Sequence, residues 1–331
     1  MRALVTGAAG FLGRVLVRRL AARGLPVRAF VRGEAPGLPD GVEVVRGDVT
    51  DPAALARAVP GCDLVFHLAG ARRGATRDGY LRTNAEGTRL LLEACAAAGA
   101  GSARFVLAGS LAASGPSRQP RREEEPFQPV EWYGESKAEA ERITLSFRDR
   151  LPVAVARPPR IVGPGDRENL LFFRLVHRGV LLRFLGPERP ISWIDVEDCA
   201  EGFLALADRP EAVGEPFFLA SAERTTTTGL QRVIAGALGA TPRELPIPPA
   251  ALRAAAALAD GLTRLTGRKL PLSRKLARQV LAPGWCCDPA KARERLGFVA
   301  ATPLRDSVER SARWYLEQGL LLRAARRQRT K

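Results

Sequence analysis

A tyrosine and a lysine four residues apart, in the stretch EWYGESKAEAER at residues 131–142, have the types and spacing of an acid/base pair. On a helix, positions i and i+4 share one face, so Tyr133 and Lys137 would point in the same direction. A free phenol has a pKa of about 10, which is too high for easy proton transfer at neutral pH. Because a neighbouring ammonium group favours the phenolate, the pair predicts a tyrosine that donates or accepts a proton. The alternative is a packed tyrosine and a solvated lysine at the start of an ordinary helix.

The elements that must position this pair repeat one rhythm along the first half of the chain: a short apolar run, a turn and an amphipathic helix. Strands that alternate with helices at this spacing predict a Rossmann-type α/β fold, a doubly wound parallel sheet with helices on both faces. We expect strands at 2–7, 26–32, 42–49, 63–70, 104–110 and 152–158, and helices at 11–23, 51–59, 83–98 and 131–148.

Three glycines follow the first expected strand, in ALVTGAAGFLGRVLVRRL, where the first helix opens. Gly7 permits a tight turn, Gly10 lets the backbone approach a pyrophosphate, and Gly13 lets helix and strand pack closely. The helix N-terminus adds unpaired N–H groups and a partial positive charge. This placement favours dinucleotide binding over a purely structural glycine turn.

Later in the chain the rhythm gives way to loops rich in proline and glycine and to separate helices, expected at 166–179, 197–208, 228–238, 249–266 and 303–318. We predict a dinucleotide-binding domain at 1–165, to which 195–220 returns through the run EPFFLA, and a smaller substrate-binding lobe at 166–194 and 221–331. The polar stretch 115–129 is expected to form a loop at the rim of the active site.

Composition narrows the classes of function. The chain has 331 residues, 46% of them hydrophobic, and its apolar stretches are interrupted by charges before they reach the length of a membrane span. Its start lacks the pattern of a secretory signal, so we expect a cytoplasmic protein. The five cysteines have no C-x-x-C spacing and are expected to be reduced core residues. The two histidines lack metal-ligand spacing, His67 is expected to pack within a strand, and we predict no metal.

The net charge of +16 could attract nucleic acid. However, the arginines are spread along the chain, and the one dense basic run is the tail 323–331, expected to be a frayed end. Aromatic residues make up 6% of the chain and are not interleaved with basic ones as in single-strand binders. We therefore rank a non-catalytic NADP-sensing or RNA-binding protein below an enzyme, and nucleic acid below a small-molecule substrate.

The glycine spacing G-x-x-G-x-x-G and several further motifs resemble the extended short-chain dehydrogenase/reductase family, in its NAD-dependent epimerase/dehydratase group. The motifs are GDVTD, HLAG, TNAEGTRLLLEA, RPPRIVGPGD, IDVEDCAEG and RERLGF. The resemblance implies that Asp48 and Val49 flank the adenine and that Pro158 to Ile161 border the nicotinamide. It places the remaining cofactor contacts at Phe11, Leu12, Leu68, Ala69, Gly70, Asn84, Tyr133 and Lys137, with Asn84 also a candidate support of the active site.

The end of the second expected strand bears on the type of cofactor. Members that bind NAD usually have an acidic residue there to hold the ribose hydroxyls, whereas this chain has Val31 and Arg32. An arginine can pair bidentately with a 2′-phosphate. NADP is therefore favoured over NAD, and the alternative is an Arg32 that stacks on the adenine or faces solvent.

The resemblance also implies that Ser110 completes a catalytic triad with Tyr133 and Lys137. Ser110 would hydrogen-bond the substrate oxygen, and Lys137 would bind the nicotinamide ribose. Members that eliminate water typically carry acidic residues just after this serine, but here Leu111 and two alanines follow. We therefore expect hydride transfer between nicotinamide and a secondary alcohol or ketone, with Tyr133 as acid/base, and keep nucleotide-sugar epimerisation as the alternative.

The substrate-facing residues are less distinctive. Phe172, Phe173, Trp193 and the apolar helix 249–262 could line a pocket for a ketone of low polarity, as in members that resemble dihydroflavonol reductase or 3β-hydroxysteroid dehydrogenase. A packed core would explain the same residues equally well. The identity of the substrate and a homodimer both stay open.

Overall fold

The computed structural model describes residues 1–72, 76–98, 104–267, 270 and 272–321, so the basic tail predicted at 323–331 lies outside the described residues. The chain divides into two compact units. Unit 1 comprises Met1–Ile161, Ser192–Ala222 and Trp285–Ala301, and unit 2 comprises Val162–Ile191, Glu223–Gly284 and Thr302–Lys331. Residues 285–301 thus group with unit 1, whereas the sequence analysis assigned them to the lobe.

Unit 1 is built on a seven-stranded sheet in the order β11-β7-β5-β4-β1-β2-β3, and all neighbours pair in parallel. The order reverses between β1 and β4, which creates a switch point where ligands bind at the carboxyl ends of the strands. The doubly wound sheet is therefore confirmed, and the run EPFFLA does return to it. The strands are β1 Ala3–Thr6, β2 Val27–Val31, β3 Glu43–Arg46, β4 Leu64–His67, β5 Arg104–Ala108, β7 Val153–Ala156 and β11 Pro216–Phe217.

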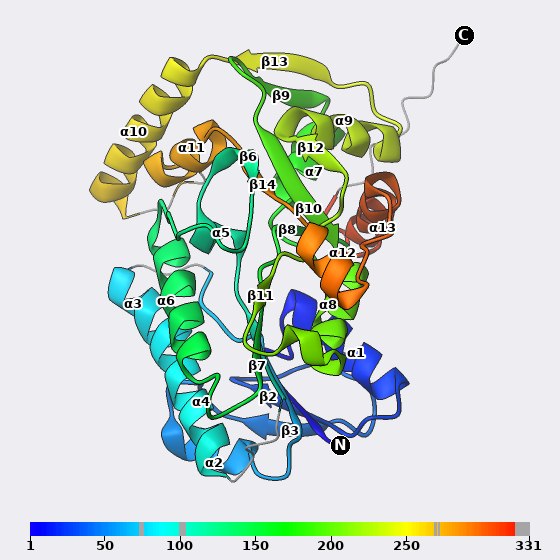
Figure 1. Cartoon of the computed structure of the whole chain (residues 1–331). Coiled ribbons are helices and arrows are strands. Elements are labelled where there is room, and N and C mark those ends of the chain that lie inside the picture. Colours follow the sequence, from blue (N-terminus) through cyan, green and yellow to red (C-terminus); the bar gives the residue numbers. More distant parts are fainter. Residues whose placement is uncertain (73–75, 99–103, 268–269, 271, 322–331) are drawn as a thin grey trace. The chain divides into compact units, whose positions relative to one another are not determined.

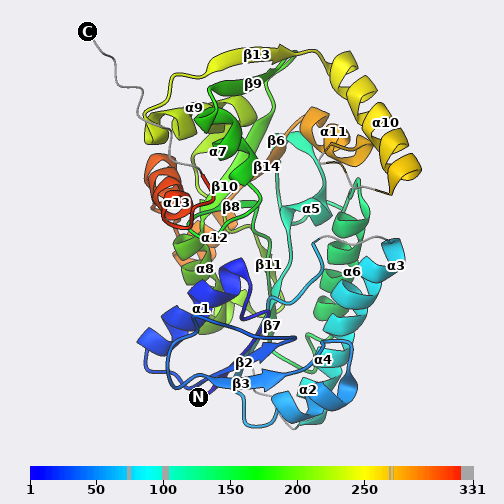
Figure 2. The same ribbon diagram turned by 180° about the vertical axis from the view of Figure 1, so that it is seen from behind.

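Helices cover both faces of this sheet, as Figures 1 and 2 show. Alternate residues of β1 enter different cores: Ala3 and Val5 pack with α1 and α8, whereas Leu4 packs with α2, α4 and α6. The second helix begins as expected, because Asp51 accepts a hydrogen bond from the Ala53 N–H and a proline follows. The helices are α1 Phe11–Ala22, α2 Pro52–Ala58, α3 Arg77–Leu81, α4 Gly87–Ala97, α5 Leu111–Ser114, α6 Trp132–Ser146, α8 Val196–Asp208 and α12 Ala290–Leu296, with a π-helical turn η1 at Arg82–Glu86 and a 3-10 turn η2 at Pro210–Ala212.

The stretch 115–129 corrects an expectation, because it contains a strand instead of only a loop. In unit 1, β6 (Ser117–Arg121) pairs in parallel with β14 (Trp285–Cys287). Arg121 and Glu123 are buried, and Glu123 accepts a hydrogen bond from the Phe218 N–H at 2.7 Å. This strand could not be predicted from the sequence, because its residues are polar and its partner strand lies far away along the chain.

Unit 2 contains a two-stranded parallel sheet of β9 (Val180–Phe184) and β13 (Arg243–Ile247), with helices around it. Phe173 is fully buried in this unit and packs edge-on against Tyr315 with ring centroids 4.7 Å apart, so it is a core residue. The remaining elements are α7 Leu170–His177, α9 Thr227–Leu238, α10 Pro249–Thr266, α11 Arg274–Leu281 and α13 Leu304–Glu317 in unit 2, β12 Arg224–Thr226, and the strands β8 Arg160–Val162 and β10 Pro190–Asp195, which cross the boundaries between the units.

Among the described residues, no helix is both long and apolar enough to cross a membrane. Within the same residues, no group of three His, Cys, Asp or Glu side chains is arranged to hold a metal ion. All five cysteines lie among the described residues, where they are buried and form no disulfide.

Candidate active site

The glycine-rich turn connects β1 to α1 and has room for backbone only. Gly7 has a φ of +69°, and a Cβ atom there would lie 2.7 Å from the Ala69 nitrogen. A Cβ atom at Gly13 would lie 2.2 Å from the Gly7 carbonyl oxygen, and one at Gly10 would lie 3.0 Å from that oxygen. Because a side chain would fill or distort this turn, the glycines keep it open to a close ligand.

The N-terminus of α1 supplies the charge that an anionic ligand needs. Gly10 is the N-cap and has no side chain to cap the helix. The first turn begins with Phe11 and Leu12, both half-buried, and carries no acidic side chain among its residues. Its N–H groups and the positive end of the helix dipole therefore fit the pyrophosphate of a dinucleotide.

The end of β2 and the loop after β3 bring basic and acidic groups together. Arg32 directly follows β2 and is exposed. Asp48 is half-buried and accepts hydrogen bonds from the Thr50 N–H at 2.9 Å and the Thr50 hydroxyl at 2.8 Å. Burial raises the pKa of Asp48, but these bonds and the charges of Arg32 and Arg82 outweigh it, and the net pKa is lowered. Asp48 is therefore ionised at neutral pH, with positive side chains nearby.

The loop after β4, from Leu68 to Gly70, lies against the glycine-rich turn and Lys137. The Leu68 and Ala69 N–H groups donate to the Thr6 carbonyl and hydroxyl, each at 3.2 Å. A Cβ atom at Gly70 would lie 3.2 Å from Lys137 Nζ. The structure therefore brings the predicted cofactor-lining loop to the predicted catalytic helix. Val49 is buried and lies against Gly87, the first residue of α4.

Lys137 lies on α6 with only 5% of its surface exposed, and its ammonium donates to the Ala108 carbonyl at 2.8 Å. Burial, together with the charge of Arg72, lowers the pKa of Lys137 to about 8. The side chain is thus held at the carboxyl end of β5, two residues before Ser110. At neutral pH, Lys137 is therefore still mostly charged.

Tyr133 and Ser110 both precede this lysine in the chain. Tyr133 lies in the first turn of α6, one helical turn before Lys137 on the same face, and is half-buried. Its ring meets the Tyr80 ring edge-on, with centroids 6.3 Å apart. Ser110 is half-buried and caps α5, where its hydroxyl accepts from the Ala112 N–H at 3.1 Å. That hydroxyl can still donate its own hydrogen to a substrate oxygen.

The segment expected to border the nicotinamide follows β7. The Pro158 carbonyl accepts a hydrogen bond from the Leu111 N–H at 3.1 Å, which joins this segment to the residue after Ser110. Pro158 therefore lies close to Ser110, and its position beside the nicotinamide stays a prediction. Ile161 is half-buried in β8.

Asn84 lies in the π-helical turn and uses its amide on the protein itself. Its Oδ1 accepts from the Ala71 N–H at 2.6 Å, and its Nδ2 donates to the Ala71 carbonyl at 3.0 Å and to Ser136 Oγ at 2.8 Å. Ser136 in turn donates to the Tyr133 carbonyl at 2.8 Å. Through Ser136, Asn84 therefore connects the loop after β4 to the backbone of Tyr133. The contacts of Ser136 could not be predicted from the sequence, because a serine within a helix carries no distinctive signal.

His67 extends this hydrogen-bond network from Asn84 to the first strand of the sheet. It is fully buried, and its Nδ1 lies 2.7 Å from the Thr6 hydroxyl. Its Nε2 lies 3.0 Å from the Thr88 hydroxyl. The Thr88 hydroxyl in turn donates to the Asn84 carbonyl at 2.6 Å. Burial and the charge of Lys137 lower the pKa of His67 to about 3, so the ring is neutral. Because Thr88 gives its hydrogen to Asn84, the ring must carry its own hydrogen on Nε2.

A buried ion pair that the sequence did not reveal anchors α6 behind the lysine. Glu141 and Arg157 are 0% and 3% exposed, and Arg157 Nη2 lies 2.6 Å from Glu141 Oε1. Arg157 also donates to the Glu123 carbonyl at 3.0 Å. These bonds tie α6 to the residue that follows β7, next to Pro158. They fix the helix on which Tyr133 and Lys137 stand.

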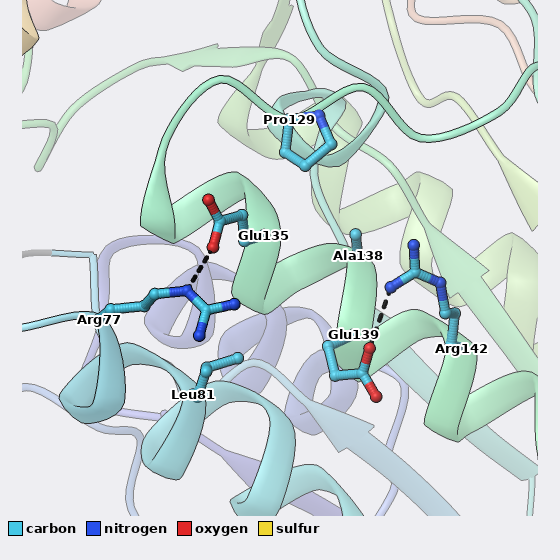
Figure 3. A pocket seen from close by; sticks show the side chains of 7 residues that line it. All are labelled: Arg77, Leu81, Pro129, Glu135, Ala138, Glu139 and Arg142. Carbon is cyan, nitrogen blue, oxygen red and sulfur yellow. Dashed lines mark hydrogen bonds and ion pairs between the residues drawn. The ribbon is translucent and has the colours of Figure 1, made fainter.

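A separate pocket of about 460 Å³ lies on the other face of α6 (Figure 3). Its charged residues pair with one another: Arg77 with Glu135 at 2.7 Å, and Arg142 with Glu139 at 3.0 Å. Glu135 and Glu139 are turned away from the face that carries Tyr133 and Lys137. The pocket is therefore distinct from the candidate active site, and Leu81, Pro129 and Ala138 complete its lining.

Comparisons with known proteins identify the family of this chain. The model of the NAD dependent epimerase/dehydratase family matches residues 3–219. The ceramide reductase of Caulobacter vibrioides is 35% identical over 96% of this chain and 95% of its own length. The 2-alkyl-3-oxoalkanoate reductase of Stenotrophomonas maltophilia is 34% identical over 94% of this chain and 98% of its own length.

The solved structure of MoeE5 in complex with UDP-glucuronic acid and NAD is 25% identical, covers 96% of this chain and 100% of its own, and gives a TM-score of 0.76. The sheet order, the glycine-rich turn and these similarities support one conclusion. The chain belongs to the NAD dependent epimerase/dehydratase family, within the extended short-chain dehydrogenases/reductases, and is a nicotinamide-dependent oxidoreductase.

Proposed function

We propose that this enzyme reduces a ketone carried on a long alkyl chain, with NADP as its cofactor and Tyr133 as the proton donor. The observation that carries the proposal is the buried Lys137, which is fixed to the Ala108 carbonyl at 2.8 Å on the helix face that it shares with Tyr133. The two reductases named above are called after ceramide and a 2-alkyl-3-oxoalkanoate, both of which carry long or branched alkyl chains. Their similarity over nearly the whole chain supports a lipophilic ketone as substrate.

The residues of this chain divide the work of such a reduction. The N-terminus of α1 binds the pyrophosphate, and Lys137 holds the ribose next to the nicotinamide. When bound, the reduced nicotinamide supplies the hydride. Ser110 donates a hydrogen bond to the ketone oxygen, where negative charge develops, and Tyr133 gives that oxygen a proton. The positive charge of Lys137 then stabilises the phenolate that remains.

The preference for NADP rests on Arg32. This exposed arginine stands where members that bind NAD usually carry an acidic residue, and Arg82 adds a second positive charge that acts on the nearby Asp48. A guanidinium pairs well with a 2′-phosphate. We also place the enzyme in the cytoplasm, and its five buried cysteines, which form no disulfide, support that location.

The test is a nicotinamide absorbance assay of the purified enzyme with a panel of 3-oxo compounds of increasing chain length and a set of UDP-sugars. We expect ketone-dependent oxidation of NADPH, faster than that of NADH and improving with chain length. Interconversion of a UDP-sugar without net oxidation of the cofactor would replace the reductase proposal with epimerisation.

A further inference from the structure

Helix α10 (Pro249–Thr266) of unit 2 exposes large apolar side chains. Leu258, Leu262 and Leu265 are 70%, 52% and 85% exposed, although leucine is usually a core residue. They follow one another at spacings of four and three residues, so they lie on one face of the helix. From the sequence, this helix could line a pocket or pack in the core, but these leucines are exposed to solvent.

The outward face of α10 is apolar along its length. At 100° per residue, the alanines at 251, 254 and 255 fall on the same side as the three leucines, and all of these positions are exposed. The opposite side contains the buried Ala256 and Ala259. Helix α11 packs against α10 and lies alongside it in Figures 1 and 2. A surface helix usually has one apolar side and one polar side, whereas apolar residues occupy both sides of α10.

Basic residues are frequent in α10 and in the neighbouring α11. Residues 249–281 contain seven arginines and lysines but only one acidic residue, Asp260. Arg253, Arg264, Arg274 and Arg278 are all exposed. Asp260 accepts a hydrogen bond from the Arg274 N–H at 3.1 Å, so the single carboxylate serves the contact between the two helices. The region therefore has a strong positive charge next to its apolar face.

We propose that α10 docks this enzyme on the surface of a lipid bilayer that contains anionic lipids. An apolar helix face with exposed arginines elsewhere on the same helix and on its neighbour is the pattern of helices that lie in the membrane interface, where the leucines enter the acyl boundary and the arginines meet lipid phosphates. The helix is not apolar enough to span a bilayer. A protein partner with an acidic rim would match the same charges, but the leucines and alanines form a convex helix face without a specific polar pattern, which suits a fluid surface.

This proposal goes beyond the proposed reductase activity and does not depend on it. A surface-bound enzyme would meet a long-chain ketone where that ketone is dissolved, in the bilayer. Membrane binding can nevertheless be measured on the full chain without turnover. A failed reductase assay and a failed binding assay are therefore separate results.

The experiment is flotation of the full-length protein with vesicles of phosphatidylcholine, with and without phosphatidylglycerol. We expect the protein to float with the anionic vesicles, less so at high salt. The triple variant Leu258→Ser, Leu262→Ser, Leu265→Ser should lower the partition coefficient roughly tenfold or more, because it removes three apolar side chains from the interface. The matched control is Leu171→Ser with Leu245→Ser, two leucines of the same unit that are 48% and 49% exposed on other elements.

Each outcome decides the proposal. Loss of flotation in the triple variant, with the control unchanged and the thermal unfolding temperature of both variants near that of the wild type, supports it. Equal flotation of the wild type and the triple variant would overturn it and assign binding to basic residues elsewhere. A wild type that does not float, and whose dimer dissociates in the triple variant by analytical ultracentrifugation, would also overturn it in favour of a second copy of this chain on α10.

Discussion

Replacement of Lys137 by methionine tests the electrostatics of the site without a substrate. Methionine keeps an unbranched apolar stem of similar length but removes the buried ammonium group. Burial lowers the pKa of Lys137 from 10.5 to about 8, so the folded protein holds this charge at a cost. The lowering corresponds to about 3 kcal/mol of free energy of unfolding.

The sign and the pH window follow from these two values. Below pH 8 the lysine is charged in both the folded and the unfolded state, so the full cost of burying the charge is present. Above pH 10.5 it is neutral in both states, and the cost vanishes. The stability of the wild type, measured relative to Lys137→Met, should therefore increase as the pH rises through this window. Between pH 7 and pH 10 the gain should be about 2.5 kcal/mol.

Urea unfolding of the cofactor-free wild type and variant at several pH values measures this difference, because the other titrating groups cancel between the two proteins. The variant should have lost its reductase activity, and its stability should lack the gain that the wild type shows as the pH rises from 7 to 10. Parallel stability curves between pH 7 and pH 10 would refute the reasoning and show that the ammonium is better solvated than its 5% exposure indicates.

Three further substitutions address other parts of the account. Arg32→Asp should lower kcat/KM with NADPH roughly tenfold to a hundredfold and improve the use of NADH, because a charge-assisted pair with the 2′-phosphate is lost; an unchanged cofactor ratio would remove Arg32 from recognition. Glu141→Gln should lower the free energy of unfolding by about 3 kcal/mol, because Arg157 remains buried without its counter-charge, and an unchanged urea midpoint would contradict this. Gly13→Ala should abolish cofactor binding in a fluorescence titration, since its Cβ atom would lie 2.2 Å from the Gly7 carbonyl oxygen, and normal affinity would argue against this role of the turn.

The parts of the fold that depend on local pattern could be predicted from the sequence. Central strands of the main sheet such as β1 and β2 are buried, mainly apolar runs, and the first helix carries its glycine signature in a continuous stretch. The proximity of Lys137 to the end of β5 was also accessible, because parallel strands end at one edge of the sheet. These features are encoded by residues close together in the chain.

Features that depend on distant partners could not be predicted. The pairing of β6 with β14 joins segments more than half the chain apart, and the polar sequence of β6 lacks the alternation of a typical strand. The contact of Asn84 with Ser136 likewise requires the fold before it can be recognised. Apolar periodicity in α10 suggested a pocket or a core, because a pattern of leucines does not reveal whether a neighbouring element covers them.

The most direct test of the central claim is the effect of Tyr133→Phe on turnover and on NADPH binding, with Tyr80→Phe as the control. Tyr80 lies edge-on to Tyr133, and its hydroxyl donates to the Arg72 carbonyl at 3.1 Å instead of serving catalysis. Loss of the proton donor should lower kcat by roughly a hundredfold to ten-thousandfold. We predict this loss for Tyr133→Phe alone, with NADPH affinity nearly unchanged in both variants. Full turnover by Tyr133→Phe would contradict the account.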